Sequence, residues 1–150
     1  MRQSSRSEAD LAPELVVVWH EMQAKFLALH PSLPQPFLTQ TYRSPEDQNA
    51  DYAKGRTAPG KVITNSRAGQ SLHNYWPSFA FDVAFKDSQG NIAWSQNLFD
   101  ALGQIGLSLG IGWGGLWLHF KDYPHYQPLN YTWEMAANHE APHYPQNLQA

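Results

Sequence analysis

The chain has 150 residues, a length typical of one compact domain. Ten Lys and Arg stand against 13 Asp and Glu, and the formal net charge of −3 gives no basic footprint for nucleic-acid binding. Because the sequence has no cysteine, it excludes disulfides, a thiol nucleophile and cysteine-ligated zinc, so any metal must be held by histidine and carboxylate.

The N-terminal half predicts a helix, a strand and a second helix. Apolar residues recur at steps of three and four over residues 15–29, with Pro13 suited to the first helical turn. Residues 37–42 are typical of a short strand. Ser44, followed by proline and two acids, predicts the start of a helix that ends at Gly55.

The C-terminal half predicts a strand at residues 79–85, where apolar and small residues alternate strictly. A helix is expected over residues 91–107 and a glycine-rich loop over 110–115. These elements favour an α+β fold, with helices packed on a small, mainly antiparallel sheet. We expect residues 1–135 to form the domain and residues 136–150 a loosely ordered Pro- and His-rich tail.

No segment approaches the roughly 20 apolar residues of a membrane-spanning helix, so we expect no membrane insertion. The first ten residues are polar, and no apolar signal-peptide region follows them. The expectation is therefore synthesis in the cytoplasm without a signal peptide.

Two distant segments could hold a catalytic metal. Asp82 lies on the small-residue face of an apolar strand, where a carboxylate is costly unless it is paired or bound to a metal. His73 precedes it, and Asp122 and His125 follow far downstream. Two imidazoles and one carboxylate leave a ligand position open for water, and a further carboxylate could take that water's proton. A buried Asp–His pair that only stabilises the fold stays an alternative.

The other histidines carry weaker signals. His20, His30 and His119 suit structural or exposed positions. Residues 139–143 match the HExxH pattern of zinc proteases, but that chemistry needs one continuous helix. Pro142 interrupts such a helix, so this match is interpreted as chance.

An ordered series of short motifs runs through residues 38–127. It comprises Thr41-Tyr-Arg-Ser-Pro-Glu-Asp-Gln48, Tyr52-Ala-Lys-Gly-Arg-Thr57, Pro59-Gly-Lys-Val-Ile-Thr-Asn65, Ser71-Leu-His-Asn-Tyr75, Ala80-Phe-Asp82, Trp113-Gly-Gly115 and Phe120-Lys-Asp-Tyr-Pro-His125. The series resembles the M15 family of peptidoglycan peptidases, especially the L-alanyl-D-glutamate endopeptidases of phage endolysins and bacterial wall enzymes. The resemblance implies the zinc fold shared with D-Ala-D-Ala dipeptidases, lysostaphin-type enzymes and hedgehog domains.

By this resemblance, the zinc ligands would be His73, Asp82 and His125. Asp122 would be the general base that activates water. Arg43 would face the substrate and stabilise the oxyanion, as a cation that does not lose its proton.

The resemblance also suggests residues around the substrate. Gln48 and Ser71 occupy motif positions that support the site, and both are candidate substrate-binding residues. Trp113 and Trp117 would form the wall of a peptide groove, with core packing an open alternative for Trp117. Tyr126 stands where the family usually has Phe and would add a hydroxyl near the site.

One interval departs from the family pattern SxHxxGxAxD. His73 and Asp82 are nine residues apart instead of seven. An even insertion leaves Asp82 on the same strand face. The inserted Trp76-Pro77 would build a longer lip beside the site.

The sequence thus predicts a monomeric zinc endopeptidase that cleaves the peptidoglycan stem peptide between L-Ala and D-Glu. It would act on the wall or in the periplasm after release through a holin-type pore, as a phage endolysin does. A D,D-carboxypeptidase or dipeptidase on the same scaffold is the alternative enzyme. A non-catalytic, zinc-containing wall-binding module is the alternative of another class, although such a module needs neither Asp122 nor Arg43.

Overall fold

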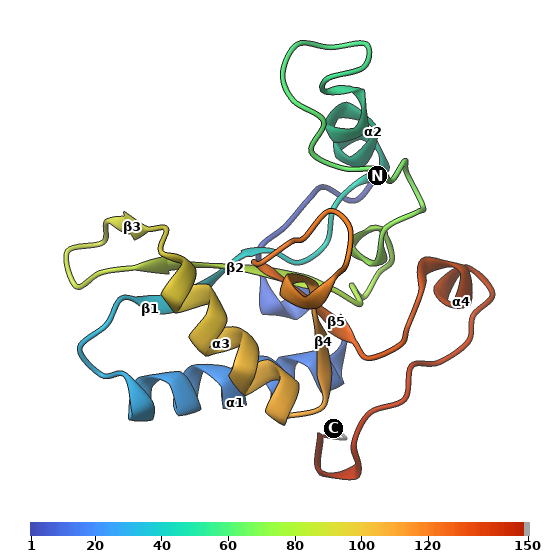
Figure 1. Ribbon diagram of the computed structural model, residues 1–150. Helices are drawn as coiled ribbons and strands as arrows, with labels where there is room; N and C mark the ends of the chain where they lie inside the picture. The colour runs from blue at the N-terminus through green and yellow to red at the C-terminus, as the bar shows by residue number, and fades with distance from the viewer. Residues whose placement is uncertain (149–150) are drawn as a thin grey trace.

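The computed structural model describes residues 1–148 and has an α+β architecture, as expected. Two long helices pack side by side against one face of an antiparallel sheet (Figure 1). The elements follow in chain order as α1 (Pro13–Leu29), β1 (Gln35–Gln40), α2 (Pro45–Ala53), β2 (Phe81–Lys86), β3 (Ile92–Ala93), α3 (Gln96–Ser108), β4 (Ile111–Trp113), β5 (His125–Pro128) and α4 (Trp133–Ala137). Short 3₁₀ turns occupy Glu8–Asp10, Leu72–Asn74, Gly114–Leu116 and Gln146–Leu148.

The sheet has the order β1-β2-β5-β4, and β3 also pairs with β2. All these pairings are antiparallel. The register places Asp82 on β2 opposite His125 on β5 and Gln40 on β1. Side chains from three strands are therefore brought to one end of the sheet.

The core lies between the sheet and α1 with α3. Helix α1 begins with Pro13 in its first turn and buries a stripe of residues at helical spacing: Leu15, Val18, Trp19, Met22 and Phe26. Strand β2 buries Phe81, Val83 and Phe85 against this stripe. Burial of one strand face turns Asp82 toward the opposite face.

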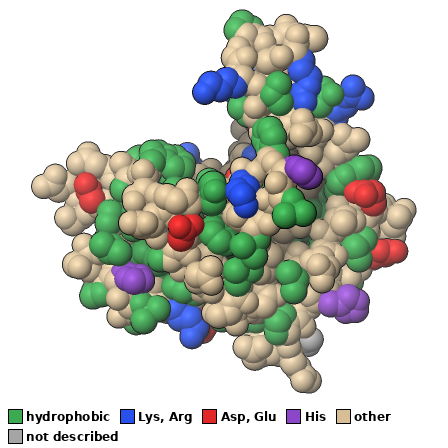
Figure 2. Space-filling view, in the orientation of Figure 1, with side chains coloured by type: hydrophobic (Ala, Val, Ile, Leu, Met, Phe, Trp, Pro, Cys, Tyr) green, Lys and Arg blue, Asp and Glu red, His purple; other side chains and the backbone are tan. Residues whose placement is uncertain are grey.

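Helix α2 begins and ends as its sequence predicts. The Ser44 hydroxyl accepts a hydrogen bond from the Asp47 backbone N–H at 3.2 Å. The chain then turns at Gly55, whose φ of +78° favours glycine. Four exposed basic residues lie at the end of α2 and in the segment that follows it (Figure 2): Lys54, Arg56, Lys61 and Arg67.

Two predicted boundaries in the second half are wrong. Helix α3 begins at Gln96, because Ile92–Ala93 pairs with β2 across a tight turn that Asp87 and Gly90 close. The expected glycine-rich loop contains strand β4. Both differences arise from pairing with distant strands, which a local pattern does not reveal.

The C-terminal segment packs against the body of the protein, where a loosely ordered tail was expected. Leu148 is buried in the main core and its 3₁₀ turn contacts α1. The Tyr131 hydroxyl donates to the Glu140 backbone carbonyl. The division between residues 135 and 136 stays a prediction.

Over the described residues 1–148, no helix combines the length and apolar character needed to cross a membrane.

Candidate metal centre

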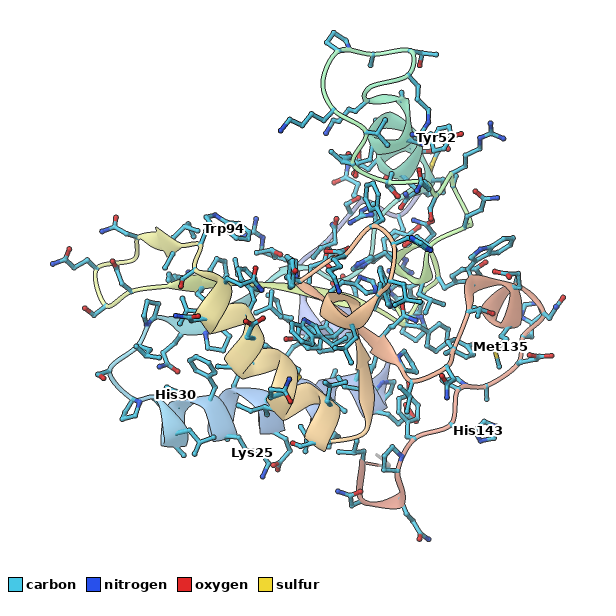
Figure 3. The ribbon with its side chains drawn as sticks, viewed as in Figure 1. Lys25, His30, Tyr52, Trp94, Met135 and His143 are labelled. Carbon is cyan, nitrogen blue, oxygen red and sulfur yellow. The ribbon has the colours of Figure 1, made fainter. Side chains whose placement is uncertain are left out.

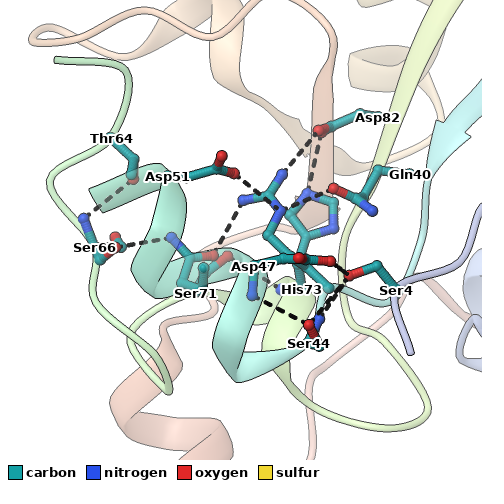
Figure 4. Close-up of polar contacts among 12 residues, drawn as sticks. Ser4, Gln40, Ser44, Asp47, Asp51, Thr64, Ser66, Ser71, His73 and Asp82 are labelled. Atoms are coloured by element: carbon teal, nitrogen blue, oxygen red, sulfur yellow. Dashed lines mark hydrogen bonds and ion pairs between the residues drawn. The ribbon is translucent and has the colours of Figure 1, made fainter. Parts of the chain in front are cut away.

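Three potential metal ligands meet at one end of the sheet. Nε2 of His73 and Nδ1 of His125 each lie 3.1 Å from the same Asp82 carboxylate oxygen, Oδ1. One ligating atom from each residue lies within 4.8 Å of the other two. Both imidazoles are buried and the carboxylate is half-buried (Figure 4 shows the His73 and Asp82 side). The structure thus brings together the three residues that the sequence proposed as ligands.

The loop that carries His73 is fixed by its own hydrogen bonds. Ser71 caps the 3₁₀ turn Leu72–Asn74, and its hydroxyl accepts from the His73 N–H at 3.2 Å. The Arg43 N–H donates to the His73 carbonyl at 2.8 Å. Ser71 therefore supports the imidazole through the backbone, and its contact with substrate stays a prediction.

Each imidazole also donates a hydrogen bond from the ring nitrogen that faces away from Asp82. His73 Nδ1 donates to the Thr41 carbonyl at 2.7 Å, and His125 Nε2 donates to Gln127 Oε1 at 2.8 Å. The Gln127 amide in turn donates to the Tyr131 carbonyl at 2.9 Å, which orients its oxygen toward the ring. With these nitrogens used, the lone pairs of neutral His73 Nε2 and His125 Nδ1 point into the centre.

This donor set fits a divalent metal. Two imidazoles and a carboxylate are the ligands of catalytic zinc, and other divalent ions accept the same set. The outward hydrogen bonds of both rings are the partners that metal-binding histidines usually have. The residues therefore suit a metal ion without identifying it.

The charges in the centre are mutually matched. Burial alone would raise the pKa of Asp82, but the positive charges of His73 and His125 and their hydrogen bonds hold it well below the ordinary value. Burial alone would lower the pKa of His125, and the hydrogen bond and charge of Asp82 raise it instead. The carboxylate thus remains ionised among the imidazoles.

Arg43 lies beside the centre. Its Nη2 is 3.6 Å from Asp82 Oδ2. Its Nε donates to Gln40 at 2.8 Å and its Nη1 to Gln48 at 3.1 Å. Two side-chain amides therefore fix the cation in place.

Gln48 acts from inside the protein. Its side chain is fully buried, and it bridges Arg43, the Asn74 amide and the Ser66 carbonyl. The structure does not bring it to a surface that a substrate can reach, contrary to the expected substrate contact. Gln48 instead holds Arg43.

Asp122 lies on the loop before β5 and faces the same centre. Its N–H donates to the Gly114 carbonyl at 3.0 Å, and its carbonyl accepts from the His125 N–H at 3.2 Å. Burial and the negative charge of Asp82 raise the pKa of its carboxyl, against the charges of the nearby histidines and Arg43. Its carboxylate is thus a separate proton acceptor beside the ligand set.

The chain also matches known proteins over these residues. Residues 64–128, which contain His73, Asp82, Asp122 and His125, match the Peptidase M15 family model described as D-alanyl-D-alanine carboxypeptidase. The chain thus carries a segment that is similar to M15 peptidases. It is homologous to the peptidoglycan L-alanyl-D-glutamate endopeptidase CwlK of Bacillus subtilis (strain 168), with 36% identity over 102 residues. That match covers 61% of this chain and 59% of the relative, so it spans less than two thirds of the relative's length.

The fold of this chain has a counterpart among solved structures. The L-Ala D-Glu endopeptidase ChiX of Serratia marcescens superposes with a TM-score of 0.55 and 22% sequence identity. The superposition covers 85% of this chain and 89% of that chain. At this level of identity the likeness establishes the fold.

A groove adjoins His125. A hollow of about 300 Å³ is lined by side chains that include Gln70, Ser71, Trp117, His125 and Gln127. The Trp117 ring lies 5.1 Å from the His125 ring and is 38% exposed. Trp117 therefore forms part of the groove wall, together with Tyr131 and Trp133.

Trp113 is oriented mainly into the core. Its side chain is 5% exposed and its indole N–H donates to the Tyr123 carbonyl at 2.7 Å. A side chain at Gly103 or Gly115 would collide with its ring. Trp113 therefore packs over two glycines in the core, and it also lines a hollow that Trp117 shares, so its role as a groove wall stays a prediction.

Tyr126 also faces the core, although it follows His125 directly. Successive residues of a strand point to opposite faces, so a site-facing His125 sends Tyr126 inward. Its ring stacks on Phe81 at 5.4 Å and is fully buried. Its hydroxyl has no hydrogen-bond partner among the described residues, and burial raises its pKa. The structure does not bring this hydroxyl to the groove.

His20 and His30 lie away from the centre. His20 pairs with Glu8 at 2.9 Å on the surface, and His30 packs near Phe26. Within residues 1–148, the one convergent trio of histidine and acidic ligands is His73, Asp82 and His125. The residues of the HExxH match at 139–143 do not belong to this trio.

Sequence reasoning missed the residues that support the ligands from behind. Gln127 lies two positions after His125 on one strand, so the period of two places both side chains on one face. Gln40 could be found only from the pairing of β1 with β2. The Thr41 carbonyl carries no side-chain signal at all.

Proposed function

We propose that this chain is a metal-dependent peptidoglycan endopeptidase that hydrolyses the stem peptide between L-Ala and D-Glu. The observation that carries the proposal is the convergence of His73, Asp82 and His125 with a separate carboxylate and a fixed guanidinium. A site that only bound a structural metal would need neither of these two groups. The names of CwlK and ChiX, both L-Ala–D-Glu endopeptidases, support the choice of bond.

The three ligands would hold zinc. When bound, the metal supplies a Lewis acid that polarises the scissile carbonyl and makes water more acidic. His73 and His125 serve as neutral ligands, because their outer nitrogens donate to Thr41 and Gln127. Asp82 contributes the negative charge of the set.

Asp122 and Arg43 divide the remaining chemistry. Asp122 accepts the proton of the attacking water and then passes it to the leaving amine. Arg43 stabilises the negative charge that develops on the carbonyl oxygen. Because Gln40 and Gln48 fix the guanidinium before substrate arrives, little reorganisation is needed during the reaction.

A D-alanyl-D-alanine carboxypeptidase is the second candidate. The family model that matches residues 64–128 carries this description, and that segment holds the ligands and Asp122. The two activities need the same chemistry at different bonds. The products therefore distinguish them.

The finer biological role stays a prediction. It comprises zinc as the resident metal, a monomeric state, release through a holin-type pore and lysis of the wall in the manner of a phage endolysin. Each of these points goes beyond the proposed activity, and each could be wrong while the proposed activity is correct.

The test is digestion of purified peptidoglycan by the zinc-loaded protein, with mass spectrometry of the products. The expected result is stem peptide with a new N-terminal D-Glu, abolished by EDTA and by Asp122→Asn with metal affinity retained. Release of terminal D-Ala alone would select the carboxypeptidase. No product from folded, metal-loaded protein would refute both enzymes and favour a wall-binding module.

A further inference from the structure

A second cavity lies outside the metal centre. It has a volume of about 770 Å³ and is bordered by the start of α1, by residues 75–79 and by residues 136–144 (Figure 3 labels Met135 and His143 on this last side). None of the three candidate metal ligands lines it. Tyr131 forms a wall that it shares with the groove beside His125.

Aromatic side chains form much of its lining: Tyr75, Trp76, Phe79, Tyr131 and Tyr144. Trp76 is 51% exposed but held in place, because its indole N–H donates to Asp10 at 2.9 Å. The guanidinium of Arg2 already lies 3.8 Å from the centroid of this ring. Trp76 is thus a fixed aromatic face that accepts a cation in this structure.

The charged groups of the lining are acidic. Glu14 comes from α1 and Glu140 from the C-terminal segment, and two histidines, His139 and His143, complete the titratable groups. The cavity lining contains no lysine or arginine. A cationic ligand would therefore meet compensating charge from two separate elements.

An unsatisfied polar group also lines this cavity. The Tyr144 hydroxyl is buried and has no hydrogen-bond partner among the described residues. A buried hydroxyl without a partner is costly, so a ligand N–H group that reached it through a small movement of the lining would stabilise it. This observation does not depend on the charge of the lining.

We propose that this cavity binds an alkylammonium ligand. Its aromatic rings would cover the aliphatic stem and the cationic head, and Glu14 and Glu140 would balance the charge. The same chemistry is offered by a lysine-like side chain of a peptide and by a free diamine. The proposal does not rest on the hydrolytic function, since no residue of the metal centre takes part.

The test measures binding of four small probes by calorimetry in mildly alkaline buffer, where imidazole groups are uncharged. Cadaverine and Nα-acetyl-lysine amide carry the ammonium group, whereas pentanol and pentanoate are neutral and anionic analogues. We expect saturable binding of the two amines only, with shifts of the Trp76 indole N–H signal in two-dimensional NMR. Tighter binding of the lysine derivative would identify a peptide side chain as the source, and tighter binding of cadaverine a free diamine.

Variants assign the binding to this cavity. Glu14→Gln and Glu140→Gln should each weaken amine binding roughly 2- to 5-fold, the range of partly exposed ion pairs. Trp76→Ala should weaken it to a similar extent, about 2- to 5-fold. Glu21→Gln removes an exposed carboxylate from the same helix α1 outside the cavity, and should change nothing.

Three results would overturn the proposal: no saturable amine binding, equal binding of pentanol, or unchanged amine affinity in the Glu14→Gln/Glu140→Gln double variant. Peptidoglycan digestion reports separately on the metal centre. Loss of digestion with intact amine binding would count against the proposed hydrolase alone.

Discussion

Gln127 offers the sharpest test of the metal centre, because it touches a candidate ligand without being one. Its Oε1 accepts from His125 Nε2 at 2.8 Å, and its own amide is fixed by the Tyr131 carbonyl. Replacing it by leucine keeps a side chain of similar length but removes the acceptor. The imidazole then loses its orientation and part of its basicity toward a metal.

Removal of such an outer partner typically lowers metal affinity about 10- to 100-fold, or roughly 1.4 to 2.8 kcal/mol. We expect Gln127→Leu to fall within this range. Gln127→Glu keeps the oxygen and should retain most of the affinity, although it loses the donor to Tyr131. Gln104→Leu, an exposed change on α3, controls for the loss of a surface amide.

The assay is competition between apo-protein and a zinc chelator, with thermal unfolding followed in parallel. Wild-type affinity in Gln127→Leu would refute the reasoning. It would show that strand pairing and the Trp117 ring orient His125 without help from the amide. Equal losses in the leucine and glutamate variants would assign the effect to the Tyr131 hydrogen bond instead.

Three further predictions address the base, the C-terminal segment and the N-terminal segment. Gly114→Ala places a methyl group against the Asp122 carbonyl. It should lower the hydrolysis rate by up to about 100-fold, and this loss should exceed the loss of metal affinity. Equal losses in peptidoglycan digestion and in metal titration would contradict a specific effect on the base. Truncation after Asn138 removes the buried Leu148 side chain. The free energy of urea unfolding should fall by at least the roughly 2–5 kcal/mol expected for Leu148→Ala, while activity per folded molecule survives. An unchanged unfolding free energy would show that the segment does not support the core. The Trp76 indole donates a hydrogen bond to Asp10 and lowers the pKa of that carboxyl, and Ser5 and Arg2 add to the effect. Ionised Asp10 therefore stabilises the fold above its unfolded-state pKa, and this contribution is lost as the pH falls through its folded-state pKa. Asp10→Asn should therefore show a smaller loss of unfolding free energy upon acidification than the wild type, and a parallel pH dependence in both proteins would exclude this contact as a source of stability.

Local sequence signals predicted the elements that local interactions decide. Ser44 and the proline after it set the start of α2, and the strict alternation around Asp82 set the face of β2. Asp82 itself could be predicted as a site residue because a carboxylate on a small-residue strand face needs a partner.

Non-local contacts decided what the sequence left out. Gly103 weakens a helix on propensity alone, yet it is the residue over which Trp113 packs. That packing turns Trp113 into the core and leaves Trp117 at the groove. The burial of Tyr126 follows from the position of its neighbour His125, and the resemblance-based substrate role overlooked this alternation.

The central position of β2 predicts different rates of amide exchange for Asp82 and His125, which lie on strands, and for Asp122, which lies on a loop. Asp82 lies on a strand that pairs with β1 on one side and with β5, which carries His125, on the other. Amides in such a strand exchange with solvent mainly when the whole domain unfolds, whereas those of a surface loop exchange through local fluctuations. The strand-borne ligands therefore belong to the slowest-exchanging part of the chain. For Asp122, which lies on the loop before β5, we expect faster amide exchange than for these strand residues.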